Sequence, residues 1–220
     1  MKVTLLAYTA LHRGNLDEHT PYVDQFDASD ADTLAEFAGR NCYLSWGRPN
    51  PATSTNEGYL ANIIAKGHES VLEHASVSFY VEGVSRSLLA ELSRHRHLSF
   101  SVVSQRYVHA DELGEVEPPL FRSLEDPVDR EVVEDVSDEV HDVTRRAYRT
   151  LTAVFEQAGY SRKVAREAAR SVLPQSTESP MVVSGNLRAW RDVLRKRYHV
   201  AADAEIREFA GLVLSELRKI

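Results

Sequence analysis

The chain has 220 residues, of which 43% are hydrophobic and 27% charged, and its formal net charge is −7. A chain of this length can bury a sizeable hydrophobic core without disulfide bonds or a structural metal. Its negative charge gives no global attraction to nucleic acid, so any anion-binding site must be local. A single cysteine, Cys42, excludes an internal disulfide framework, and no apolar run approaches the ~20 residues of a membrane helix. We therefore expect a cytoplasmic protein with no membrane contact and no nucleic-acid partner.

In chain order, the first half predicts a buried strand over residues 3–9, a polar loop over 10–30, helices over 30–46 and 55–66, a strand over 74–82, a helix over 84–95 and a β-rich segment over 100–108. The start is also similar to a short signal peptide, but the apolar run is brief and His12 and Arg13 follow it, which favours a strand. Alternation marks the second strand, with Ala75, Val77, Phe79 and Val81 on one face.

The second half predicts an acidic loop over residues 111–127, helices over 127–158 and 162–173, a strand over 181–184, and helices over 186–197 and 203–217. We expect Asp126, Asn186 and Asp203 to be N-caps. An apolar stripe on the longest helix suits packing within the chain or a contact between subunits equally well: Val133, Val136, Val140, Val143, Ala147, Leu151 and Val154. This order predicts an α+β fold, with a small, mostly antiparallel sheet covered by helices in a single domain over residues 1–220.

A concentrated basic segment stands out in this acidic protein. Residues 92–110 contain no Asp or Glu, but they contain Arg94, His95, Arg96, His97, Arg106 and His109, interleaved with hydroxyl groups. Arginine pairs bidentately with phosphate, and hydroxyls add further donors. The segment therefore predicts a site for one or more phosphorylated small molecules.

The same residues also allow three other interpretations. A solvated basic turn could pair with Glu91 or Asp111. A metal site from His95 and His97, or from His68 and His74, lacks carboxylate or cysteine ligands, so we expect no metal. An RNA-binding or phosphoprotein-binding module is disfavoured by the net charge and by the shortage of stacking aromatics beyond Phe100 and Tyr107.

The spacing of the basic residues carries a resemblance to a known family. Arg94, His95 and Arg96, followed after seven residues by Ser104, Gln105 and Arg106, are similar to the signature of flavin-dependent thymidylate synthases. Further similar stretches are residues 67–70 with 73–74, residues 165–174, and residues 185–188 with Arg197. The resemblance implies the fold of that family and spans most of the chain.

The resemblance implies two sets of binding residues. Flavin adenine dinucleotide (FAD) would contact the triplet, an Asn-any-Arg pair and flanking positions: His68, Ser70, Arg94, His95, Arg96, Asn186, Arg188 and Asp192. The substrate deoxyuridine monophosphate (dUMP) would contact Arg86, Glu91, Arg94, Val102, Ser104, Gln105, Arg106, Arg170 and Arg197. Arg197 would be the catalytic residue, placed against the uracil ring to stabilise developing negative charge.

Two positions depart from the family's pattern. Val102 and Val103 fall where many members place a polar residue, so Val102 can offer only its backbone. Asp192 falls where Asn or His is expected near the flavin, and an acid there would be repelled by reduced flavin unless Arg188 or Arg195 paired with it.

The reaction implied by the resemblance is reductive methylation of dUMP to dTMP. Methylene-tetrahydrofolate supplies the carbon and NADPH-reduced FAD supplies the hydride, while the protein contributes positioning and electrostatics. No enzyme nucleophile is needed, and Cys42 is expected to be a small buried residue on an apolar helix face. The family also implies a homotetramer. Among enzymatic functions, the main alternative is a flavoprotein that only oxidises NADPH.

Overall fold

The computed structural model describes residues 1–19, 28–48 and 50–220. Its centre is a four-stranded sheet in the order β1 (Lys2–Tyr8), β2 (Ser76–Glu82), β4 (Met181–Asn186) and β3 (Ser99–Val102). Every neighbouring pair is antiparallel. The predicted α+β fold with a small antiparallel sheet is therefore confirmed.

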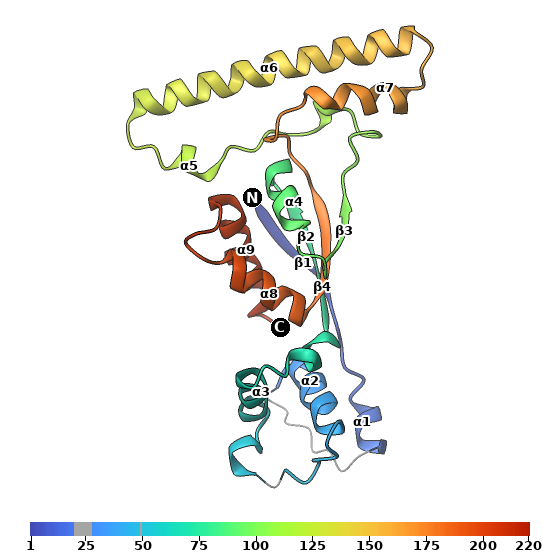
Figure 1. Cartoon of the computed structure of the whole chain (residues 1–220), viewed down its shortest axis with the longest axis vertical. Coiled ribbons are helices and arrows are strands. Elements are labelled where there is room, and N and C mark those ends of the chain that lie inside the picture. Colours follow the sequence, from blue (N-terminus) through green and yellow to red (C-terminus); the bar gives the residue numbers. More distant parts are fainter. Residues whose placement is uncertain (20–27, 49) are drawn as a thin grey trace.

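Three helices cover one face of this sheet (Figure 1): α4 (Arg86–Leu92), α8 (Leu187–Arg197) and α9 (Ala204–Leu217). The predicted alternation in β2 is confirmed, because Val77, Phe79 and Val81 are buried in this core. Trp190 of α8 stands edge-on to Phe79 at 5.1 Å between ring centroids and donates from Nε1 to the Val77 carbonyl at 3.2 Å. This packing fixes α8 against the sheet.

Helical units extend the sheet at both ends, which gives the molecule an elongated, three-tiered shape (Figure 1). One unit contains α1 (Gly14–His19), α2 (Asp30–Asn41), α3 (Asn56–Ala65) and the 3₁₀ turns η1 (Pro51–Thr53) and η2 (Glu69–Glu73). The other contains η3 (Ala110–Glu112), α5 (Pro119–Arg122), α6 (Pro127–Gln157), α7 (Arg162–Ala169) and η4 (Arg170–Val172). Each unit has a small core of its own, around Tyr59 in the first and Tyr148 in the second.

The three predicted N-caps are confirmed by side-chain hydrogen bonds. Asp126 accepts from the Val128 amide at 2.8 Å, Asn186 from Ala189 at 2.8 Å, and Asp203 from Glu205 at 2.9 Å. No helix in the described part of the chain is long and apolar enough to span a membrane.

Several element boundaries differ from the sequence-based expectation. The loop predicted over 10–30 contains α1, which has a single buried apolar residue, Leu16, and so shows no periodicity; residues 20–27 lie outside the described residues. β1 is an edge strand and is largely exposed, with Leu6 at 53%, so its predicted burial is wrong. The β-rich segment is a strand only to Val102, because a turn begins at Ser104.

Helix ends also differ. The helix predicted over 30–46 stops at Asn41, and Leu44 takes a left-handed backbone (φ 49°) that a helix cannot continue through. Cys42 is therefore the C-cap and is exposed, which corrects its expected burial. The helix predicted over 84–95 spans only Arg86–Leu92, the one predicted over 162–173 changes to a 3₁₀ turn after Ala169, and the last strand continues to Asn186.

Candidate active site

The basic triplet lies in the tight connection between α4 and β3. Backbone hydrogen bonds from His95 to Leu92 and from Leu98 to His95 close successive turns there. His95 and Leu98 are buried, whereas Arg94, Arg96 and His97 are exposed. A Cβ at Gly185 of β4 would lie 2.5 Å from Leu98 Cδ2, so the glycine permits this close approach. The turn thus anchors its histidine inward and presents its arginines to solvent.

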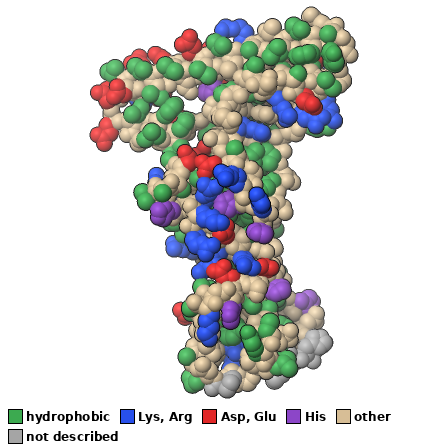
Figure 2. Space-filling view, viewed as in Figure 1, with side chains coloured by type: hydrophobic (Ala, Val, Ile, Leu, Met, Phe, Trp, Pro, Cys, Tyr) green, Lys and Arg blue, Asp and Glu red, His purple; other side chains and the backbone are tan. Residues whose placement is uncertain are grey.

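A groove runs beside α8 and connects this turn with η2. It consists of two adjoining cavities of about 520 and 400 Å³, which share His97, Ala189, Asp192 and Lys196. The larger is completed by Glu69, Glu73, Asn186, Arg188 and Arg195, and the smaller by Arg94, His95, Arg96, Leu98 and Arg197. Figure 2 shows Lys, Arg and His side chains gathered over this middle part of the molecule.

The acids in the groove are paired with bases. Glu73 pairs with Arg188, Glu69 lies 3.5 Å from Arg191, and Asp192 contacts both Arg195 at 2.9 Å and Lys196 at 2.8 Å. Arg195 is therefore a partner of Asp192 as expected, while Arg188 turns to Glu73 instead. Arg94 and Arg96 make no ion pair within the described residues, which leaves the groove locally positive.

Arg197 is held by two side chains from the other wall. Its Nη1 donates to Glu91 Oε2 at 2.7 Å and its Nε donates to His95 Nε2 at 3.0 Å. The other ring nitrogen of His95, Nδ1, lies 3.6 Å from Asp192 Oδ2. Burial, followed by the positive charge of Arg197, lowers the pKa of His95. The imidazole is thus neutral at neutral pH, and it links the groove's acid to the predicted catalytic arginine.

The predicted flavin residues largely meet in the groove. Arg94, His95, Arg96, Asn186, Arg188 and Asp192 line it. Ser70 and His68 are exposed at η2, next to the lining residues Glu69 and Glu73, but they do not line the cavities themselves.

The predicted dUMP residues fall into two groups. Glu91, Arg94 and Arg197 lie at the groove, but the remainder do not line it: Arg86, Val102, Ser104, Gln105, Arg106 and Arg170. Arg106 pairs with Glu167 of α7 at 2.7 Å. Burial, followed by repulsion from Arg170, lowers the pKa of Arg86, which places these two cations near one another. A second basic cluster therefore lies toward α7.

Sequence reasoning missed several residues of both basic regions. Lys196 lines the groove, and only the basic run at the end of α8 hinted at it. Near the second cluster, Lys163 of α7 lies over the Tyr107 ring at 5.3 Å, and Arg166 donates to the Tyr107 carbonyl. A hydrogen bond from Lys163 lowers the pKa of Tyr107. Arg166 belongs to the stretch 165–174 that is similar to the family, although no role was predicted for it, whereas Lys163 had no sequence signal beyond the helical spacing of α7.

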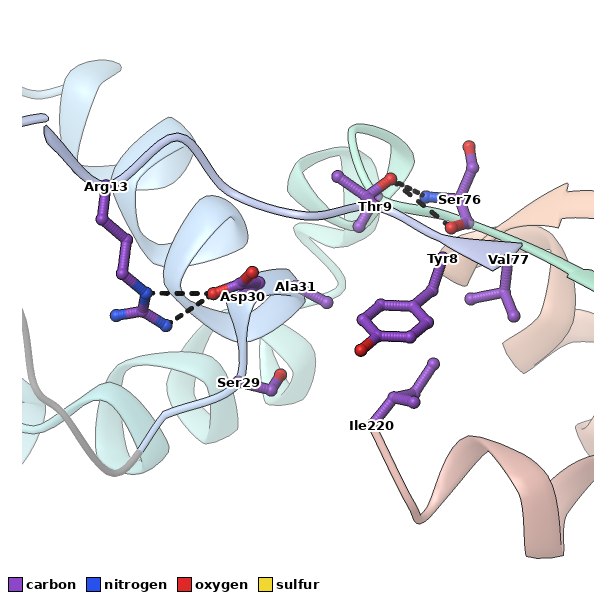
Figure 3. Close-up of a pocket in the computed structure, with 10 residues that line it drawn as sticks. Tyr8, Thr9, Arg13, Ser29, Asp30, Ala31, Ser76, Val77 and Ile220 are labelled. Carbon is purple, nitrogen blue, oxygen red and sulfur yellow. Dashed lines mark hydrogen bonds and ion pairs between the residues drawn. The ribbon is translucent and has the colours of Figure 1, made fainter. Parts of the chain in front are cut away.

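A third cavity, of about 240 Å³, lies between β1 and the start of α2 (Figure 3). Tyr8 and Ile220 lie beside one another in its wall, and Arg13 pairs with Asp30 at 2.6 Å along its edge. None of the predicted site residues lines it. Across residues 1–19, 28–48 and 50–220, no group of His, Cys, Asp and Glu has the arrangement of a metal site.

Comparisons with known proteins identify the family. The family model described as "Thymidylate synthase complementing protein" matches residues 24–220. A "Probable flavin-dependent thymidylate synthase" of Mycobacterium phage D29 is 56% identical over 100% of this chain and 93% of its own length. A flavin-dependent thymidylate synthase of Mycobacterium tuberculosis is 48% identical over 88% of this chain and 78% of its own length.

The fold has a solved counterpart. Thymidylate synthase X from Helicobacter pylori, crystallised with FAD and dUMP, superposes with a TM-score of 0.61 over 98% of this chain and 92% of its own, at 24% identity. The fold, the triplet and the sequence matches agree, and the chain belongs to the flavin-dependent thymidylate synthase family.

Proposed function

We propose that this chain catalyses the reductive methylation of dUMP to dTMP, with methylene-tetrahydrofolate as carbon donor and NADPH-reduced FAD as hydride source. The observation that carries the proposal is the groove in which the basic triplet and Arg197 meet. Family membership supports the same reaction. Arg197 is the residue we assign to the uracil ring.

The donors of the groove fit FAD. A pyrophosphate needs several cationic donors, and the exposed Arg94 and Arg96 make no ion pair among the described residues, while Arg188 is half-exposed on its pair with Glu73. Asn186 uses Oδ1 as the helix cap, which leaves its Nδ2 as a donor. When bound, FAD supplies the hydride chemistry; the chain's own residues bind it and hold the charges around it.

The protein's share of the chemistry is electrostatic. A guanidinium held by Glu91 and His95 offers donors toward the carbonyl–imide edge of a pyrimidine and stabilises negative charge that develops there. Because Asp192 is paired with Arg195 and Lys196, its negative charge is compensated at the groove. No step requires a thiol, and Cys42 does not line the groove.

We infer that the site is completed in a homotetramer. The second basic cluster (Arg86, Arg106 and Arg170) and the adjoining residues Ser104 and Gln105 do not line the groove that contains Arg197. A second copy can bring its own cluster to that groove. The apolar stripe of α6 is exposed in the single chain, with Val136 at 57% and Val140 at 46%, so it is open for such a contact. Within each copy, residues 1–220 act as one domain.

A cytoplasmic setting is also proposed, because an exposed free thiol such as Cys42 suits a reducing compartment.

The test is a visible spectrum followed by a dUMP-dependent assay. The purified protein is expected to show flavin absorbance, alone or after addition of FAD, and to form dTMP when NADPH, methylene-tetrahydrofolate and dUMP are supplied. NADPH oxidation that proceeds without any dTMP would identify a simple flavin oxidase instead. A folded, flavin-free protein that shifts RNA would overturn the assignment.

A further inference from the structure

His95 lies between an acid and a base that face opposite edges of its ring. Arg197 Nε is 3.0 Å from Nε2, and Asp192 Oδ2 is 3.6 Å from Nδ1. A guanidinium has donors but no acceptor, so Nε2 must carry the lone pair. The ring proton is therefore on Nδ1, on the edge that faces Asp192. The protein geometry thus selects one of the two neutral tautomers.

The charged side chains that face the His95 imidazole come from α8, from α4 and from the histidine's own segment. From α8, Asp192, Lys196 and Arg197 act on His95, and Glu91 of α4 lies beyond Arg197. On the histidine's own segment, Arg94, Arg96 and His97 are exposed. Asp192 is the one acid within ion-pair distance of the ring in the described residues. Asp192 faces Nδ1 from one edge of the ring and Arg197 donates to Nε2 at the other, so both residues favour the neutral tautomer with the proton on Nδ1.

Asp192 is itself held in place. Its two oxygens contact Arg195 at 2.9 Å and Lys196 at 2.8 Å, one turn further along α8. If the proton moved to Nε2, an N–H would point at the Nε–H of Arg197 and push the guanidinium away. Arg197 would then keep only its Glu91 contacts.

We propose that Asp192 is a positioning residue that fixes the Nδ1–H tautomer of His95 and thereby aims Arg197 at the substrate's uracil ring. The inference rests on the proposed function for the identity of the substrate, but the tautomer can be measured without any ligand. It gives a role to an acid at a position where Asn or His was expected. Removing the carboxylate that orients a metal-bound histidine typically lowers affinity or activity by about tenfold to a hundredfold, and we expect the lower end of that range at this metal-free site.

The experiment compares Asp192→Ala and Asp192→Asn with the wild type. Two-bond ¹H–¹⁵N spectra of the ligand-free protein report the tautomer, and His95→Gln assigns the His95 signals by their loss. We expect a protonated Nδ1 and a bare Nε2 in the wild type, a shift toward Nε2–H in Asp192→Ala, and retention of Nδ1–H in Asp192→Asn, because the amide keeps an acceptor oxygen on that side of the ring. The matched control is Glu216→Ala, which removes a helical acid paired with Lys219 on α9.

The second readout is the affinity of each variant for dUMP. In Asp192→Ala the dissociation constant for dUMP should rise by about tenfold, with partial rescue in Asp192→Asn and no change in Glu216→Ala. An unchanged His95 tautomer and unchanged dUMP affinity in Asp192→Ala, in a wild type that does methylate dUMP, would overturn the inference and leave the proposed function intact. A wild-type protein that binds neither FAD nor dUMP would overturn the function, whereas the spectra would still test whether Asp192 sets the tautomer.

Discussion

Arg197 of α8 and Glu91 of α4 are joined by a hydrogen bond of 2.7 Å, and a second guanidinium nitrogen lies 3.4 Å from the Glu91 carbonyl. The two helices are 106 positions apart in sequence at these residues. Together with His95, Glu91 holds the guanidinium plane in one orientation. The catalytic proposal therefore depends on the planar fork of arginine and not merely on its charge.

Replacing Arg197 by lysine tests that dependence. Lysine keeps the charge but cannot donate to Glu91, His95 and a pyrimidine at once, so dTMP formation should fall by about a hundredfold, the cost of losing one well-placed donor. Flavin reduction by NADPH without dUMP should stay near the wild-type rate, because Arg94, Arg96 and Arg188 are unchanged. Stopped-flow flavin bleaching beside a methylation assay measures both.

The control for Arg197→Lys is Arg218→Lys, at an exposed arginine just past α9. It should leave both half-reactions unchanged. An equal loss of flavin reduction and methylation in Arg197→Lys would assign Arg197 to the flavin or to the fold, and no loss in either would remove it from the site.

Replacing Cys42 by alanine should keep dTMP formation within about twofold. The thiol is exposed at the end of α2, where it donates a weak hydrogen bond of 3.4 Å to the Ala38 carbonyl, and it does not line the groove. Surface substitutions of this kind change the free energy of unfolding by less than about 0.5 kcal/mol. A loss of several orders of magnitude in turnover, in a variant with unchanged melting temperature, would show that the reaction uses an enzyme thiol after all.

Local signals in the sequence were sufficient for much of the fold. The caps Asp126, Asn186 and Asp203 act on amides two or three residues away, and the alternation in β2 reflects burial of one face of a strand, so both are visible in a short window. The end of α2 was not visible, because Leu44 adopts a left-handed backbone that leucine does not favour by itself. Leu44 is 74% exposed, and the conformation accompanies a turn in which the Ser45 amide donates to the Arg40 carbonyl at 3.1 Å.

The site likewise combines local motifs, which the sequence shows, with long-range contacts, which it does not. The triplet and the Asn-any-Arg pair are local motifs, and both line the groove. The contacts that give them chemistry join His95 to Arg197 and Arg188 to Glu73, across 102 and 115 positions. Arg188 and Arg195 were both within helical reach of Asp192, and only the packing of η2 against α8 decided that Arg188 pairs with Glu73. Sequence spacing cannot rank such competing partners.

The lowered pKa of His95 predicts a pH dependence with a definite sign. The folded-state pKa lies below the unfolded value of about 6.5, because burial and Arg197 disfavour the imidazolium. The neutral ring therefore contributes stability that is fully present above about pH 6.5 and is lost as the pH falls through the lowered folded-state pKa. Asp192 stays charged throughout this window, since hydrogen bonds from Lys196 and Arg195 outweigh its burial and lower its pKa.

The measurement is the melting temperature and the dUMP dissociation constant of wild type and His95→Gln between about pH 5 and pH 8. Wild type should lose stability and dUMP affinity toward acid more steeply than His95→Gln, whose side chain does not titrate. Parallel profiles for the two proteins would show that protonation of His95 does not release Arg197.

Glu205 near the start of α9 is expected to stabilise the helix that carries Glu91. Its carboxylate is buried and accepts from the Ser85 amide at 2.8 Å and from the Ser85 hydroxyl at 2.5 Å. Ser85 in turn caps α4 by accepting from the Leu88 amide at 3.0 Å. In Glu205→Gln the side chain has one acceptor oxygen where the carboxylate has two, so only one of the two hydrogen bonds can be kept. The free energy of unfolding should therefore fall by roughly 1–3 kcal/mol.

Chemical denaturation of Glu205→Gln beside Glu208→Gln provides the comparison on a single helix. Glu208 is partly exposed and pairs with Arg122 at 2.8 Å, and exposed pairs contribute only about 0–1 kcal/mol. A double-mutant cycle of Glu205→Gln with Ser85→Ala should show strong coupling, because each change removes the other's partner. Equal destabilisation by Glu205→Gln and Glu208→Gln, together with additive effects of the Glu205 and Ser85 changes, would mean that α4 is held by its apolar contacts with the core and not by this carboxylate.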